Sequence, residues 1–106
     1  MMIDNTINEQ KLKDIQDRCK NRMDMSFYKY GPARLNFGES RCDAVNSAEA
    51  CIDKFNKTGN NEYLHDAINY LIFRILFPMP GEFFESTGSN ESAGVCGTPI
   101  NLEKGD

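Results

Sequence analysis

The stretch Lys57–Pro80, KTGNNEYLHDAINYLIFRILFPMP, decides the fold of this chain. At about 100° per residue it predicts one helix over residues 60–77, begun by Asn60 or Asn61 and ended by the prolines that follow. The wide apolar face of this helix carries Leu64, Ala67, Ile68, Leu71, Ile72 and Ile75, and its aromatic edge carries Tyr63, Tyr70 and Phe77. A helix that is apolar almost all round is expected to be buried.

A polar stripe interrupts this helix at Glu62, Asp66 and Asn69, at spacing i, i+4 and i+7. Carboxylates are seldom buried without a partner or a task, so the stripe is a candidate row of ligand-binding groups facing a pocket between helices. In the alternative interpretation, Asp66 and Asn69 bond to loop backbone, and Glu62 only favours a helix N-terminus.

Two further helices are predicted before it. The first covers about residues 6–25, where Thr6 and Glu9 have the spacing of a capping box and apolar residues recur at helical spacing. The second covers residues 40–57, with Ser40 as the N-cap and Gly59 as a left-handed C-terminal glycine. The apolar stripes are Leu12, Ile15, Cys19 and Met23 on the first helix, and Val45, Ala48, Ile52 and Phe55 on the second.

Between these helices, residues 26–39 are predicted to be a connection, because Gly31-Pro32 is a turn signal. The connection is rich in aromatic and basic residues, and guanidinium groups suit phosphate or carboxylate while tyrosine can stack on a base. The alternative is that its arginines pair with carboxylates of the chain itself. The candidate ligand-binding residues are Tyr28, Tyr30, Arg34, Asn36, Arg41, Asp66, Asn69 and Tyr70.

The composition narrows the function classes. The chain has 106 residues and a formal net charge of −4, which fits one domain and disfavours nonspecific nucleic-acid binding. The four cysteines, at 19, 42, 51 and 96, form no CxxC pair and stand beside a single histidine, so a zinc site is not expected. We interpret them as reduced and structural, and His65 as a structural or exposed residue.

No leader peptide or membrane-spanning segment is evident, since Arg74 interrupts the longest apolar run. Residues 81–106 are rich in Gly, Ser, Thr and Asn and are predicted to form an extended C-terminal arm, separate from a helical domain over residues 1–80. The candidate anchors of the arm are Phe83, Phe84, Val95 and Ile100. The segment 86–92 is either an anion-binding nest or, more simply, a surface turn. The expected fold class is all-α, with three helices.

The strings YGPARLNF and KTGNNEYLHDAINYLIF, followed by a proline-containing turn, a Phe pair and a Ser/Thr/Glu/Gly-rich tail, resemble a group of small uncharacterised phage proteins. The resemblance covers about residues 29–94. It implies a viral origin and a small protein in the cytoplasm of a bacterial host, and it implies no activity by itself.

The helix over residues 60–77 is also similar to the metal-binding helix of MazG-type all-α nucleotide pyrophosphohydrolases. That family carries ExxE and ExxD pairs that hold Mg²⁺ at a triphosphate. Here the acidic pairs are Glu62 with Asp66 and Glu49 with Asp53, each one residue too long. A Mg²⁺-dependent pyrophosphohydrolase therefore remains an alternative function.

The favoured expectation is a binding protein without a catalytic residue, cofactor or metal. It would be a phage counter-defence protein that sequesters a nucleotide-derived immune signal, of cyclic nucleotide or cyclic ADP-ribose type, without cleaving it. A modest core and an over-apolar helix also favour a homo-oligomer. A third possibility is an inhibitor that binds a host protein through Tyr and Arg.

Overall fold

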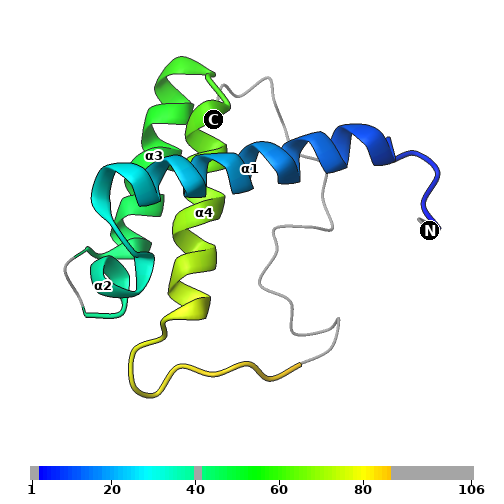
Figure 1. Cartoon of the computed structure of the whole chain (residues 1–106). Helices are drawn as coiled ribbons and strands as arrows, with labels where there is room; N and C mark the ends of the chain where they lie inside the picture. The colour runs from blue at the N-terminus through cyan, green and yellow to red at the C-terminus, as the bar shows by residue number, and fades with distance from the viewer. Residues whose placement is uncertain (1–2, 40–41, 87–106) are drawn as a thin grey trace.

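The computed structural model describes residues 3–39 and 42–86, which form four helices (Figure 1). These are α1 (Glu9–Tyr30), α2 (Ala33–Phe37), α3 (Ala44–Thr58) and α4 (Glu62–Leu76). The described part contains no strand, so the predicted all-α class is confirmed. The expected three helices are present as α1, α3 and α4, and α2 is a short addition between the first two.

Helix α1 begins and ends later than predicted. Its N-cap is Asn8, whose side chain accepts the backbone N–H of Lys11 at 2.9 Å. The predicted capping box is therefore wrong, because the Thr6 backbone N–H and hydroxyl both bond to Asp4 instead. Residues 26–30 continue the helix, since nothing before Gly31-Pro32 removes a backbone donor or forbids helical backbone angles.

The turn after α1 is set by Gly31 and Pro32. Gly31 has φ +82° and donates its N–H to Phe27 O at 2.9 Å, a left-handed conformation that favours glycine. Pro32 then precedes the single turn of α2. The Asn36 side chain donates to Tyr30 O at 3.1 Å, which ties α2 back to the end of α1.

Helices α3 and α4 form an antiparallel hairpin (Figure 1). The N-cap of α3 is Asp43, which accepts the N–H of Asn46 at 3.0 Å, so the helix begins later than the predicted residue 40. Gly59 is left-handed at φ +73° and closes α3 as predicted. Asn61 is the N-cap of α4, and Asn60 Oδ1 accepts the N–H of Glu62 at 3.0 Å.

The core is small and made largely of small side chains. Ala44 and Ala48 on α3 and Ala67 on α4 are buried where the two helices pack closely. Phe73 is buried as well and stacks on Phe37 of α2, with ring centroids 4.7 Å apart. Cys19 is the buried residue of α1, which crosses the hairpin while its N-terminal half extends beyond it (Figure 1).

The expectation that α4 is buried on all its apolar positions is wrong for the single chain. Ile75 is 77% exposed and Leu76 is 60% exposed. Part of the apolar face of α4 therefore contacts solvent, as does Ile52 of the α3 stripe. Large apolar side chains that are exposed in this region are Ile52, Ile68, Leu71, Ile75 and Leu76.

In the described part of the chain after α4, Glu82 forms an ion pair with Arg74. Arg74 Nε lies 2.9 Å from Glu82 Oε1, which also accepts the N–H of Met79 at 3.0 Å. Phe83 and Phe84 are 81% and 90% exposed and so do not anchor this segment on the described part of the chain. The other expected anchors, Val95 and Ile100, lie outside the described residues, as does nearly all of the segment 86–92.

Two simpler expectations concern cysteines and membranes. Cys19, Cys42 and Cys51 are free, and Cys96 lies outside the described residues. Within the described ranges, none of the helices combines the length and apolarity needed to cross a bilayer.

Candidate functional site

The polar stripe of α4 faces α1 and is bound there by an arginine. Arg22 Nε donates to Asp66 Oδ1 at 2.7 Å, and its Nη2 donates to Asp66 Oδ2 at 3.2 Å. The same Nη2 reaches Glu62 Oε2 at 3.0 Å. These bonds raise the pKa of Arg22, Asp66 contributing most. The fork-to-fork geometry fixes how α1 crosses α4.

Two more contacts continue this polar interface along α4. Buried His65 lies with Nδ1 at 2.7 Å from Asn61 O, and its Nε2 accepts from Arg18 Nε at 3.2 Å. One turn further, Asn69 Nδ2 donates to Cys19 O at 2.9 Å. His65 is therefore a structural residue. The polar stripe thus joins α4 to α1. Asp66 is neither a free ligand-binding group nor bonded to loop backbone, because its carboxylate is bound by Arg22.

The acidic pairs required by the pyrophosphohydrolase alternative are not assembled in the described part of the chain. Glu49 and Asp53 are exposed on α3. Glu62 and Asp66 share Arg22. Within residues 3–39 and 42–86, no group of three or more His, Cys, Asp or Glu side chains is placed to hold a metal ion.

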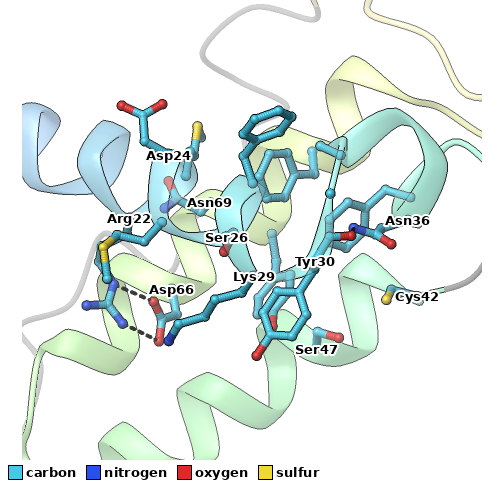
Figure 2. A pocket seen from close by; sticks show the side chains of 18 residues that line it. Arg22, Asp24, Ser26, Lys29, Tyr30, Asn36, Cys42, Ser47, Asp66 and Asn69 are labelled. Atoms are coloured by element: carbon cyan, nitrogen blue, oxygen red, sulfur yellow. Dashed lines mark hydrogen bonds and ion pairs between the residues drawn. The ribbon is translucent and has the colours of Figure 1, made fainter.

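Beside the polar interface lies a cavity of about 700 Å³, bounded by the C-terminal half of α1, by α2 and by α4, with α3 at its edge (Figure 2). Its volume falls within the usual range for small-molecule sites, roughly 300–1,000 Å³. Its lining combines aromatic rings, amides and charged groups. The lining includes Arg22, Asp24, Ser26, Phe27, Lys29, Tyr30, Asn36, Phe37, Ser47, Asp66, Asn69, Tyr70 and Phe73.

Five of the eight candidate ligand-binding residues line this one cavity. They are Tyr30, Asn36, Asp66, Asn69 and Tyr70. Tyr28 is exposed away from the lining and packs edge-on against Phe27. Arg34 is also outside the lining. Its Nη1 lies 3.9 Å from Glu39 Oε2, as expected if the arginine pairs with a carboxylate of the chain itself. Arg41 lies outside the described residues.

The aromatic wall of the cavity is built by contacts between α2 and α4. The Tyr70 ring meets Phe37 at a centroid distance of 6.0 Å and an interplanar angle of 70°, while Phe37 stacks on Phe73. Burial raises the pKa of the Tyr70 phenol above its ordinary value. The angles of these rings are thus set by their contacts with one another.

Sequence reasoning missed the residues that α1 contributes to the cavity. Arg22, Ser26 and Lys29 all lie on the lining, and Ser47 of α3 faces them across its edge (Figure 2). The available signal was Arg22 on one predicted amphipathic helix and the acidic pair Glu62 and Asp66 on another, since a buried carboxylate needs a cationic partner.

The amide oxygen of Asn69 is a buried polar atom of this site without a partner among the described residues. Asn69 is 7% exposed, and its Oδ1 accepts no hydrogen bond from the described residues. The amide cannot be turned over to relieve this, because Oδ1 would then oppose the carbonyl oxygen of Cys19. An unused buried acceptor costs free energy unless a donor from outside the chain meets it.

Comparison of the chain with protein-family models, with curated proteins and with solved structures found no match, so the site is interpreted from its own geometry.

Proposed function

We propose that this chain is a binding protein that holds a small nucleotide-like ligand in the cavity between α1, α2 and α4, without cleaving it. In biological terms, we propose that it is a phage counter-defence protein that sequesters a nucleotide-derived immune signal. The observation that carries the proposal is the convergence of Tyr30, Asn36, Asp66, Asn69 and Tyr70 on one cavity.

The side chains at this cavity suit a nucleobase. The rings of Tyr30, Phe37 and Tyr70 offer apolar faces and edges on which a planar base can lie. Asn69 lines the cavity and carries a buried amide oxygen without a partner among the described residues, which a base N–H can meet when α1 opens locally. Sequestration requires only such contacts, whereas hydrolysis requires a nucleophile, a base or a metal in reach of the scissile bond.

The pyrophosphohydrolase alternative has less support from the described geometry. Both carboxylates of its first acidic pair are engaged by Arg22, and those of its second pair are exposed on another helix. Binding of Mg²⁺ there would require Asp66 to exchange a bidentate arginine for a metal ion.

The proposal is tested by incubating the protein with a panel of nucleotides and nucleotide-derived signals, measuring the melting temperature, and releasing the ligand by heat. We expect at least one member to raise the melting temperature and to be recovered chemically unchanged. Recovery of a cleaved ligand would overturn sequestration in favour of hydrolysis, and a panel without any shift would overturn nucleotide binding.

A cavity-filling variant locates the binding. Ser47→Phe places a ring at the edge of the cavity, and we expect it to abolish the shift seen with the wild-type protein. The matched control is Glu49→Phe, which adds the same ring to an exposed position of the same helix. Equal ligand binding by both variants would place the site elsewhere.

We also propose that the protein is a homo-oligomer, because its core is small and its apolar surface is large. Among the described residues no side chain is less than 2% exposed. Ile75 and Leu76, in contrast, contact solvent. Burying such side chains yields about 25 cal/mol per Å², which favours association of these faces. Sedimentation of wild-type protein and of Ile75→Glu tests this, and a wild-type monomer at micromolar concentration would refute it.

A further inference from the structure

We propose that the cavity selects a ligand with a single negative charge and a nucleobase N–H donor, as in a 3′,5′-cyclic mononucleotide, over ligands that carry two or more phosphate charges. The inference rests on the proposed function and names its ligand class. It depends on two features of the cavity, the charges on its lining and the unpartnered oxygen of Asn69.

The charges on the described lining sum to zero. The cations are Arg22 and Lys29, and the anions are Asp24 and Asp66. Arg22 is already committed to Asp66 and Glu62. Asp24 lies 3.6 Å from Lys20, which is outside the lining. With Arg22 paired to Asp66 and Asp24 paired to Lys20, one cation of the described lining remains to meet a ligand's phosphate charges, so a second or third phosphate charge would find no cation there.

Lys29 is that uncommitted cation. Within the described part of the chain no carboxylate lies within ion-pair distance of its ammonium group, although Lys29 lines the cavity. Figure 2 shows its side chain extending, like that of Tyr30, from the end of α1 towards α3 and α4. A Lys at the last turn also complements the helix dipole, but this role does not require the side chain to enter a cavity. One ammonium group matches one phosphodiester charge.

The second feature selects the base. Asn69 Oδ1 can only accept, and its amide is oriented by the bond to Cys19 O. The group that satisfies it must therefore donate an N–H or O–H. A nucleobase donates N–H groups from its ring plane, and aromatic rings of the same cavity can contact its faces. Losing a partner of a buried acceptor is costly, which makes the contact selective.

The test is a calorimetric comparison of three charge forms of each base: the nucleoside, the 3′,5′-cyclic monophosphate and the triphosphate, with cyclic dinucleotides and cyclic ADP-ribose alongside. We expect the cyclic monophosphate of one base to bind at least about tenfold more tightly than its nucleoside or its triphosphate. Equal or tighter binding of a form with two or more phosphate charges overturns this inference and leaves the proposed function standing. Absence of binding by every compound overturns both.

Two variants assign the contacts. Lys29→Gln should weaken the cyclic monophosphate about tenfold and leave the nucleoside unchanged, while Lys13→Gln, an exposed lysine of the same helix outside the lining, should change neither. Asn69→Leu should weaken all forms of the preferred base. Because Asn69→Leu could disturb the α1–α4 contact, the wild-type protein is also measured with an analogue whose base N–H groups are fully methylated. Undiminished binding of that analogue would overturn the role of Asn69.

Discussion

Helix α4 is held on two sides by different kinds of contact. Against α3 it packs through small apolar residues, Ala44, Ala48 and Ala67, whose size lets the helices approach closely. Against α1 it is held by a polar interface in which Arg22 and Arg18 reach Asp66 and His65. The first contact is dry and joins neighbours in sequence, and the second is partly solvated and joins residues more than forty positions apart. We therefore expect the hairpin to be the more stable unit and the contacts of α1 to be the weaker ones.

The largest test of this comparison is Phe73→Ala. Phe73 is buried and stacks on Phe37, so its loss leaves a cavity where α4 meets α2. We expect the free energy of unfolding to fall by about 3 kcal/mol, measured by urea denaturation. A smaller loss than that caused by Arg22→Met would show that the apolar contacts of α4 stabilise the fold less than its polar contacts with α1.

Ala48→Leu tests the close approach of α3 and α4 directly. Ala48 is 2% exposed, so three extra carbon atoms have no space without moving a helix. We expect a loss of about 2 kcal/mol in the free energy of unfolding. The control is Ala50→Leu on the exposed face of the same helix, which should be nearly neutral. A neutral Ala48→Leu would show that the two helices are more loosely packed than described.

Arg22→Met tests the polar side. The side chains of Arg22 and Asp66 are 39% and 29% exposed, so solvent screens part of their attraction, and we expect a loss of about 1 kcal/mol. In a double-mutant cycle with Asp66→Asn, we expect Arg22→Met to cause no further loss in the free energy of unfolding. Arg34→Met, which breaks a longer and more exposed contact with Glu39, is the matched control. Equal effects of both arginines would remove the special role of Arg22.

The smallest expected effect concerns Glu82, a polar contact within one local turn. Bonds from Arg74 and from the Met79 N–H lower the pKa of Glu82 from 4.5 to about 2. A carboxyl whose folded pKa is depressed stabilises the fold fully above the unfolded value and loses this contribution as the pH falls from about 4.5 to about 2. The protection factor of the Met79 amide, which corrects its exchange rate for the intrinsic pH dependence, should therefore fall over this range, and Glu82→Gln should remove this change. A midpoint near 4.5 would contradict the ion pair.

The parts of the fold that could be predicted are those fixed by local chemistry. Gly59 ended α3 as predicted because its left-handed backbone is a one-residue property, and the prolines after Leu76 ended α4 for the same reason. The start of α3 was misplaced because Asp43 and Ser40 are both good N-caps and only one is used. The end of α1 differs from the prediction because the turn signal Gly31-Pro32 requires only that the helix stop by Tyr30, and residues 26–30 are compatible with a helix.

The candidate site could be predicted in its α4 half and not in its α1 half. Asp66, Asn69 and Tyr70 follow from the periodicity of one helix, which the sequence displays directly. The partner of Asp66 depends on which face of α1 docks, and that is settled by tertiary contacts over 44 positions. The burial of α4 was overestimated because hydrophobic periodicity identifies an apolar face without showing what covers it.

The short connection between α3 and α4 has a consequence for the order of folding. Only Gly59–Asn61 separate the two helices, so their contacts close a small loop and can form early. The contacts of α1 close much longer loops and follow later, so we expect the cavity to be the last part of the fold to form. By the same reasoning we expect it to be the first to open, so the ligand that we propose would reach Asn69 through a local opening of α1 while the hairpin stays folded.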